Sequence, residues 1–343
     1  MRLAIITDTH FGARNENGAL LQSTINFFSD IFFPYLDDSE IDTVLHLGDL
    51  VDRRRSINFL ILNNLRNSFI NPLVEREIQT HIVVGNHDMY YKNTNQVNSV
   101  NELYGTTDII HVYDSITDVE FDGLKVCLVP WICPENEAET FIHLNRTDAQ
   151  VVMGHLELKG FTMHSGMVCE HGYGVEDFSK FDQVFSGHFH HKNGNGHVEY
   201  LGAPYELTWS DYDSPRGFHI YDTDTRELEF IQNPVPNFVR LEYSELATTD
   251  FDLKDKFVKV IVKNKDNPYH FEKYMSEVNQ SAPYVVRIIE ERLDFSDTTE
   301  MVDEAQDTMT ILGKYVDDMD TGLDKSKLKV LLGELYTESM EII

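Results

Sequence analysis

The expected fold of this chain is decided by the stretch Ile82-Val83-Val84-Gly85-Asn86-His87-Asp88. A β-branched apolar run, typical of a buried strand, stops at Gly85. Three polar residues that can bind a metal or transfer a proton follow at once. Because sites in open α/β sheets form beyond the carboxyl ends of strands, the stretch predicts a strand that delivers these side chains to a site.

The same layout occurs four more times along the chain. Each copy is a short apolar run that ends in Asp or His: Ala4-Ile5-Ile6-Thr7-Asp8-Thr9-His10, Val44-Leu45-His46-Leu47-Gly48-Asp49, Val151-Val152-Met153-Gly154-His155 and Val184-Phe185-Ser186-Gly187-His188-Phe189-His190. One Gly-Asp or Gly-His pair alone is more often an ordinary turn. Five strand ends of this kind favour a metal site, and we expect a single sheet edge to collect them.

The composition indicates a soluble globular protein. The 343 residues suffice for one large domain with an appendage or for two domains, and 41% are hydrophobic. We expect no membrane span, because no apolar run reaches about 18 residues. We also expect no signal peptide, since Asp8 and His10 interrupt the N-terminal apolar stretch. Three cysteines without paired spacing predict free thiols and a cytoplasmic location.

The net charge of −30 opposes contact with nucleic acid at long range. A protein with this charge that acts on DNA needs metals, local arginines or a basic partner to hold the phosphates. The alternative is that the charge serves only solubility.

The first part of the chain predicts α/β units followed by a meander. Continuous apolar runs predict strands at 2–7, 42–47, 80–84, 125–130, 150–153 and 182–186. Helical spacing predicts helices at 20–36, ending near Pro34, and at 57–69, with Ser56 as a possible N-cap. Residues 92–101 predict a loop, whereas 197–201, 217–222 and 227–231 predict neighbouring antiparallel strands. The expected architecture is a two-sheet α/β sandwich flanked by helices.

The stretch Asn233-Pro234-Val235-Pro236-Asn237 marks the end of this domain, at about residue 236. Residues 237–293 predict a small ββαβ cap, and the acidic residues 294–308 predict a linker. Residues 309–343 predict a helical tail. One face of that tail carries Leu328, Leu331, Leu332, Leu335 and Tyr336. This face either packs on its own domain or docks on a partner, and the acidic tether favours docking.

The polar strand ends offer the ligands that two divalent cations need. Asp8 and His10 are two residues apart and project the same way from an extended segment. Asp49 is placed to bridge two ions, and Asn86 adds a neutral oxygen. Three histidines complete the set: His155, His188 and His190.

These motifs resemble the calcineurin-like metallophosphoesterase superfamily. Within it the chain resembles the SbcD-type repair nucleases, and is closer still to the small subunits of recombination endonucleases of T-even-type phages. The motifs concerned are Asp8-x-His10, Gly48-Asp49-x-x-Asp52, Gly85-Asn86-His87-Asp88, Gly154-His155 and Gly187-His188-x-His190. The resemblance implies one cation on Asp8, His10, Asp49 and His190, and a second on Asp49, Asn86, His155 and His188. It implies manganese, with magnesium as the alternative, and the mixed nitrogen and oxygen donors do not distinguish manganese from iron or zinc.

The resemblance also implies two catalytic residues that are not ligands. His87 would stabilise the transition state and protonate the leaving oxygen. The carboxylate of Asp52 would orient His87, as the third member of a catalytic triad orients its base. The alternative is that Asp52 is a helix-start carboxylate beside Arg53.

Basic residues near these motifs are candidates for holding DNA phosphates: Arg53, Arg54, Arg55 and Arg14, with Lys92 weaker. The arginine run could equally be a solvated helix start that balances nearby acids. Tyr90 and Tyr91 could stack on a base, although packing is the favoured interpretation.

The activity implied by the resemblance is that of a two-metal DNA nuclease subunit. It would combine 3′–5′ exonuclease activity on duplex ends with endonuclease activity on single strands and hairpins. It would work with an SMC-like coiled-coil ATPase, as a homodimer within a heterotetramer, in double-strand-break processing, recombination and recombination-dependent replication. The alternatives are a phosphoprotein phosphatase or another phosphodiesterase, and a scaffold with a vestigial site. Arg54 stands where the phosphatase signature has Gly.

Overall fold

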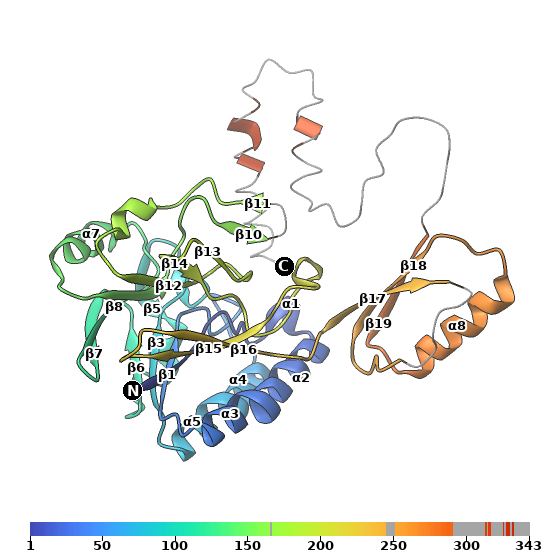
Figure 1. The fold of residues 1–343 in the computed structure, drawn as a ribbon, viewed down its shortest axis with the longest axis horizontal. Helices are drawn as coiled ribbons and strands as arrows, with labels where there is room; N and C mark the ends of the chain where they lie inside the picture. The colour runs from blue at the N-terminus through green and yellow to red at the C-terminus, as the bar shows by residue number, and fades with distance from the viewer. Residues whose placement is uncertain are drawn as a thin grey trace. The chain divides into compact units, whose positions relative to one another are not determined.

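The computed structural model describes residues 1–164, 167–244 and 251–290, and in the tail residues 313, 315–316, 325, 327–329 and 331–332. The chain divides into two compact units (Figure 1). The first comprises Met1–Leu207 and Asp211–Asn237, and the second comprises Thr208–Ser210 and Phe238–Ile343. The predicted linker at 294–308 lies outside the described residues.

The first unit is built on two six-stranded sheets. The first sheet has the order β16 (Leu228–Gln232), β15 (Gly217–Asp222), β1 (Arg2–Ile6), β2 (Thr43–His46), β3 (Gln79–Val83), β6 (Ile110–Tyr113). The second has the order β13 (Asn193–Gly194), β14 (Val198–Tyr200), β12 (Gln183–Gly187), β9 (Val151–His155), β8 (Leu124–Val129), β7 (Thr117–Phe121). The strands that precede the polar motifs, β1–β2–β3 and β9–β12, pair in parallel.

The sheets bury both of their faces, which explains the continuous apolar runs. Successive residues of β1 point to opposite sides. Leu3 and Ile5 belong to the core between the two sheets, which also contains Val126 and Met153. Ala4 and Ile6 belong to the core under the helices. The predicted two-sheet sandwich flanked by helices is therefore confirmed.

Two long helical stretches cover the first sheet. They consist of α2 (Gly18–Phe27), η1 (Phe28–Phe32) and α3 (Phe33–Asp38), and of α4 (Phe59–Leu65), η2 (Arg66–Ile70) and α5 (Asn71–Glu75). The prediction that Pro34 ends the first helix is wrong. Both stretches contain a π-helical segment that ends two residues before a proline, Pro34 or Pro72. The wider i→i+5 turn accommodates the missing N–H, so the helix continues.

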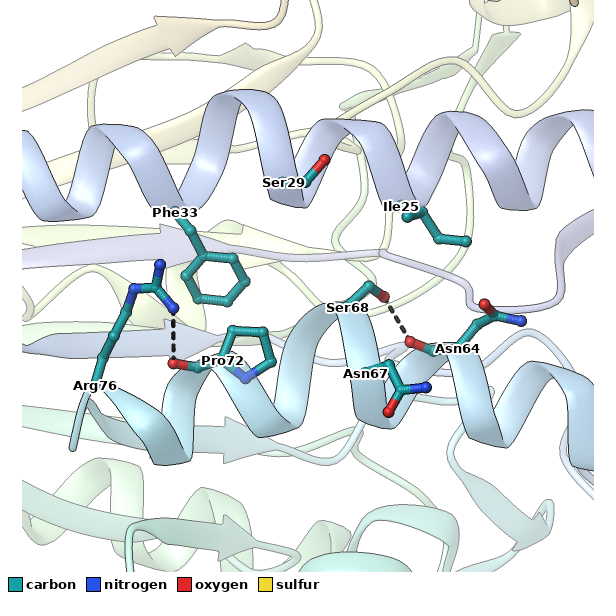
Figure 2. A pocket seen from close by; sticks show the side chains of 8 residues that line it. All are labelled: Ile25, Ser29, Phe33, Asn64, Asn67, Ser68, Pro72 and Arg76. Carbon is teal, nitrogen blue, oxygen red and sulfur yellow. Dashed lines mark hydrogen bonds between the residues drawn. The ribbon is translucent and has the colours of Figure 1, made fainter.

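A pocket of about 340 Å³ lies between these two helical stretches (Figure 2). Arg76 closes one end, with its guanidinium 4.9 Å from the centre of the Phe33 ring. The lining residues are Ile25, Ser29, Phe33, Asn64, Asn67, Ser68, Pro72 and Arg76, and no predicted ligand is among them.

Three local predictions are wrong. Residues 92–101 are not a loop, because β4 (Met89–Tyr91) and β5 (Thr94–Asn98) form a hairpin that leads into α6 (Ser99–Tyr104). The helix predicted at 57–69 begins at Phe59, capped by Asn58 and not by Ser56. The strand at 198–200 pairs in parallel with β12 and so belongs to the second sheet, away from β15 and β16.

The remaining elements of the first unit are short connections and one helix. α7 (Glu137–Arg146) buries Leu144 in the core on the outer face of the second sheet. The others are α1 (Ala13–Glu16), β10 (Thr162–His164), β11 (Met167–Val168), η3 (Val175–Phe178) and, crossing the unit boundary, η4 (Trp209–Asp211).

The described residues of the second unit between 238 and 290 form three parallel strands and one helix, in chain order β17 (Phe238–Tyr243), β18 (Phe257–Val262), α8 (Pro268–Gln280) and β19 (Val285–Glu290). The helix begins at the Asn267 cap and buries Phe271, Tyr274 and Val278 against the strands. Among the described residues, no helix is both long and apolar enough to cross a membrane.

The buried imidazole of His219 on β15 predicts an acid-sensitive fold. Burial lowers the pKa of His219 to about 3, below the ordinary value of 6.5. Between these values the unfolded chain binds a proton that the folded chain does not bind. Stability is therefore complete above pH 6.5 and is lost as the pH falls toward 3.

In urea titrations from pH 7 to pH 4, His219→Leu is expected to show a shallower loss of unfolding free energy than the parent, by up to about 1.4 kcal/mol per pH unit. His171→Leu, which changes an exposed histidine, is the matched control. Parallel curves for the parent and His219→Leu would contradict the prediction.

Candidate metal centre

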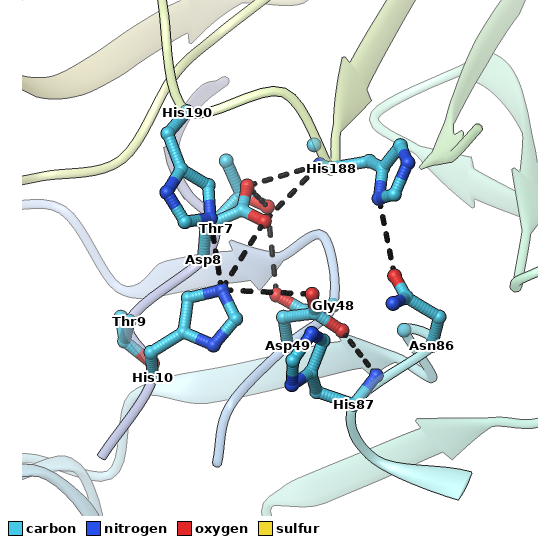
Figure 3. Close-up of polar contacts among 12 residues, drawn as sticks. Thr7, Asp8, Thr9, His10, Gly48, Asp49, Asn86, His87, His188 and His190 are labelled. Carbon is cyan, nitrogen blue, oxygen red and sulfur yellow. Dashed lines mark hydrogen bonds and ion pairs between the residues drawn. The ribbon is translucent and has the colours of Figure 1, made fainter. Parts of the chain in front are cut away.

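The predicted ligands come from five strand ends and lie in one cluster (Figure 3). Asp8 and His10 follow β1, Asp49 follows β2 and Asn86 follows β3. The histidines come from the other sheet: His155 is the last residue of β9, and His188 and His190 follow β12. The expectation of a single sheet edge is therefore wrong, since two facing sheets supply the residues.

The backbone is strained where the ligands leave their strands. Asp8, His10, Asp49 and His188 all have positive φ, between 40° and 86°. Non-glycine residues adopt this conformation rarely, and such strain gathers at functional sites. Here it turns the chain sharply after each strand, which brings the side chains back over the sheet ends.

Two glycines leave the space in which the cluster forms. Gly48 has φ +98°, and a Cβ there would lie 2.5 Å from His155 Nδ1. A Cβ at Gly85 would lie 2.3 Å from Asp49 Oδ1. Any side chain at either position would displace a predicted ligand, which explains why glycine precedes Asp49 and Asn86.

One group of donors consists of Asp8, His10 and His190. The Nε2 atoms of His10 and His190 are 3.0 Å apart, and His10 Nε2 lies 3.9 Å from Asp8 Oδ1. Burial lowers the pKa of both imidazoles, so they are neutral and can offer lone pairs. Thr7 Oγ1 and the backbone N–H of His188 donate to the Asp8 carboxylate and hold it in place.

A second group consists of Asn86, His155 and His188. Asn86 Oδ1 lies 3.0 Å from His155 Nε2 and 3.1 Å from His188 Nδ1. His155 Nδ1 donates to the Leu47 carbonyl at 2.7 Å, which leaves Nε2 directed at the cluster. Such a hydrogen bond from the far nitrogen is the usual arrangement of a metal-binding histidine.

Asp49 lies between the two groups. Its Oδ2 atom is 3.6 Å from His10 Nε2 and 3.3 Å from His155 Nε2. Burial alone would raise the pKa of Asp49, but the imidazoles of His155 and His87 hold it well below its ordinary value. Burial would likewise lower the pKa of His155, yet Asp49 raises it to about 9. The site therefore favours positive charge beside Asp49.

The donor set suits divalent cations. Each group combines imidazole nitrogens with carboxylate or amide oxygens, which borderline and hard divalent ions accept. Asp8–His10–His190 and Asp49–His155–His188 each bring ligand atoms within 4.8 Å of one another. One carboxylate faces both groups, so the residues present fit a pair of ions. The mixed set is compatible with manganese and does not select it.

His87 lies beside this cluster with its ring nitrogens in distinct roles. Nδ1 donates to the backbone carbonyl of Asp52 at 2.6 Å, so Nε2 is the nitrogen available to a substrate. Although burial would lower the pKa of His87, Asp49 and the Asp52 carbonyl hold it above the ordinary 6.5. A histidine that is protonated near neutral pH can act as a general acid.

The expected role of the Asp52 carboxylate in orienting His87 stays a prediction, and the structure places two different contacts on this residue. Asp52 holds His87 through its backbone carbonyl, whereas its Oδ1 atom lies 3.5 Å from His10 Nδ1. The carboxylate therefore faces a predicted ligand. Burial raises the pKa of Asp52 to about 6.

Asp88 is a site residue that sequence reasoning left without a role. Its buried carboxylate accepts hydrogen bonds from the backbone N–H groups of Gly85, Asp49 and Leu50, at 2.8–3.0 Å. It therefore ties the turn after β3 to the turn after β2. The only signal in the sequence is a third polar residue after Gly85.

The four predicted DNA-contacting arginines lie around the site. Arg14, Arg53 and Arg55 are exposed and Arg54 is half-buried. The positive charges of Arg53 and Arg14 act on Asp52, and that of Arg54 acts on His87. Arg53 also bonds to Asn15 and lies 3.5 Å from Glu16. All four arginines precede α4 in chain order, and none lies within it.

Part of the predicted docking face can be placed. Leu328, Leu331 and Leu332 are helical, and Leu331 is about half exposed. Leu335 and Tyr336 lie outside the described residues.

Comparison with known proteins places the chain in a family. The family described as calcineurin-like phosphoesterase matches residues 1–192, more than half of the 343 residues. Exonuclease subunit 1 of Enterobacteria phage T4 is 31% identical, over 99% of this chain and 100% of its own length. The SbcD component of the nuclease SbcCD from Staphylococcus saprophyticus subsp. saprophyticus is 22% identical, over 87% of this chain and 85% of its own.

Among solved structures, a purple acid phosphatase from yellow lupin (Lupinus luteus) seeds is 17% identical, with a TM-score of 0.38 over 64% of this chain and 48% of that one. The residues matched by the family, 1–192, span all the strand-end motifs of this chain. The chain belongs to the calcineurin-like phosphoesterase family.

Proposed function

We propose that this protein is a metal-dependent DNA nuclease subunit that hydrolyses phosphodiester bonds. The observation that carries the proposal is the position of Asp49 Oδ2 between His10 Nε2 and His155 Nε2, with His87 next to the cluster. Two relatives, a phage exonuclease subunit and a component of the nuclease SbcCD, support nucleic acid as the substrate. We propose manganese as the metal, with magnesium as the alternative.

In this proposal Asp8, His10, Asp49 and His190 hold one ion, and Asp49, Asn86, His155 and His188 hold the other. When bound, the ions would polarise the phosphodiester and lower the pKa of a water. The remaining step belongs to His87, whose Nε2 gives a proton to the departing sugar oxygen. The Asp52 carbonyl keeps Nδ1 protonated and so presents Nε2 in the required direction.

The net charge of −30 affects how this chain can bind DNA. The chain repels DNA at long range, so we infer a partner that supplies much of the DNA-binding surface. An SMC-like coiled-coil ATPase docked on the helical tail would fill this role, in a heterotetramer with two nuclease subunits. The unit with β17, β18, α8 and β19 would act as the cap over DNA, and the arginines before α4 would hold phosphates locally.

A nuclease assay on the full chain tests the proposal. We expect cleavage of end-labelled duplex, hairpin and single-stranded DNA with added manganese, none after chelation, and 3′–5′ polarity on duplex ends. Addition of the ATPase is expected to increase activity on duplex ends.

A phosphopeptide is the comparison substrate, because the phosphatase alternative uses the same kind of metal site. Release of phosphate from the peptide, with no cleavage of any DNA, would replace the nuclease proposal by the phosphatase alternative. Absence of bound ions under saturating manganese would point to a scaffold with a vestigial site.

A further inference from the structure

Tyr90 and Tyr91 follow the turn after β3 that carries His87, and both side chains are exposed. Tyr90 is 39% exposed and Tyr91 is 52% exposed. Both side chains therefore keep a substantial part of their surface in water. Large aromatic side chains left in water beside a reaction centre suggest a surface that is covered when a ligand binds.

The backbone gathers the two rings instead of separating them. In a regular strand, successive side chains point to opposite faces. Pairing of β4 with β5 shifts register between Met89 and Tyr91, and the ring centres of Tyr90 and Tyr91 lie 4.7 Å apart, edge to face. Such irregularities occur next to active sites, where they redirect side chains.

The hairpin is anchored to the metal cluster on two sides. Met89 is fully buried, and the backbone N–H of Ser99 donates to the Asp88 carbonyl at 2.8 Å. Asn95 Nδ2 donates to the carbonyl of Trp131, whose ring lies 4.9 Å from that of His188. Tyr90 is three positions after His87 in the chain, which limits the distance between their Cα atoms to at most about 11 Å. The hairpin therefore starts close to His87, at a distance comparable with one or two nucleotide spacings.

A positive charge accompanies the rings. The guanidinium of Arg55 lies 5.9 Å from the centre of the Tyr90 ring, within the range of a cation–π interaction. Arg55 is exposed and is the last of the three arginines that follow Asp52. Aromatic faces beside a cation match the chemistry of an unpaired nucleobase and its phosphate, because each base offers a π-face and each phosphate a negative charge.

We propose that Tyr90 and Tyr91, with Arg55, form a stacking subsite for an unpaired nucleobase next to the scissile phosphate. This inference rests on the proposed nuclease function and adds a preference for single-stranded or splayed DNA. A base-paired nucleotide already has its faces covered by its neighbours, so the subsite favours strand ends, hairpin loops and single strands.

Cleavage kinetics with manganese test the subsite on two oligonucleotides, one single-stranded and one of the same length with abasic residues around the cut. The double variant Tyr90→Ala/Tyr91→Ala is expected to raise KM for the normal oligonucleotide about tenfold or more and to leave kcat nearly unchanged. Tyr90→Phe/Tyr91→Phe keeps both rings and is the matched control, with KM close to that of the parent. On the abasic oligonucleotide, the three proteins are expected to have similar KM values.

Two results would overturn the inference: an unchanged KM for the alanine variant, or an equal rise of KM on both oligonucleotides. If KM is unchanged and the oligomeric mass of the alanine variant falls, a second copy of the chain covers the rings instead of a nucleobase. Bis(p-nitrophenyl) phosphate, which has no nucleobase, separates this inference from the proposed function. If the parent hydrolyses it and cuts neither oligonucleotide, the nuclease proposal fails and the stacking subsite fails with it. If the parent cuts the normal oligonucleotide, only the alanine variant decides the subsite.

Discussion

Replacing His87 by alanine is expected to lower kcat on a DNA duplex end by about 10²–10⁴-fold while metal binding is retained. His87 contributes no atom to the ligand groups proposed for the two ions. Its Nδ1 donates to the Asp52 carbonyl, and Asp49 and that carbonyl hold the pKa of the imidazole above its ordinary value, which favours the protonated form. Loss of the imidazole therefore removes the acid for the leaving oxygen and leaves the cations in place. Single-turnover cleavage and manganese titration by calorimetry measure the two properties separately.

The matched control is Asp52→Asn. It changes the carboxylate, which faces His10, but keeps the backbone carbonyl that orients His87. We expect a much smaller loss of kcat than for His87→Ala. A His87→Ala variant that cuts as fast as the parent, or an equal loss in both variants, would contradict the assignment.

The pH profile offers a further check of the same role. An acid must be protonated, so kcat is expected to fall as the pH rises through the pKa of His87, which lies above 6.5. His87→Ala should lack that alkaline limb.

Replacing Asp49 by asparagine is expected to abolish binding of a full pair of manganese ions, with affinity at least about 100-fold weaker and nuclease activity lost with it. Loss of a group that only orients a metal ligand already weakens a metal site by about 10–100-fold, and Asp49 faces both ligand groups directly. Asparagine preserves the shape and the acceptor for the His87 backbone N–H, so the fold should persist. Calorimetry and metal analysis of the folded variant measure the loss.

Asp118→Asn is the matched control for Asp49→Asn. Asp118 forms another cluster with Cys127 and His143, outside the proposed centre. Its replacement should leave manganese binding and activity at the parent level. If the Asp49→Asn variant still binds two ions tightly, the assignment of Asp49 as the bridging ligand is contradicted.

The fold class and the candidate ligands could be predicted from the sequence because both depend on local pattern. A buried parallel strand needs a continuous apolar run, and its ligands lie at or just beyond its carboxyl end. Asp8, Asp49, Asn86, His155 and His188 all lie at a strand end or within three residues of it. Helix ends were less predictable: Pro34 ends no helix, because a π-helical turn absorbs the missing N–H.

The division of the ligands between two sheets could not be predicted, since the period of a strand says nothing about which sheet it joins. The backbone contact between Asp52 and His87 could not be predicted for a similar reason. A sequence shows a carboxylate three residues after Asp49, but not that the backbone carbonyl would reach His87 first. The register shift between Met89 and Tyr91 likewise arises from pairing with a strand whose register the sequence does not state.

The sequence by itself determined which residues end each strand, and thereby the chemical identity of the donors. Only the tertiary structure decided how those donors meet: His10, from the neighbouring strand of the same sheet, lies 3.6 Å from Asp49 Oδ2, and His155, from the facing sheet, lies 3.3 Å from it. The physical reason is the separation along the chain over which each effect acts. Burial pattern and turn chemistry act over a few neighbouring residues, whereas a shared carboxylate depends on packing between segments more than 100 residues apart in the chain.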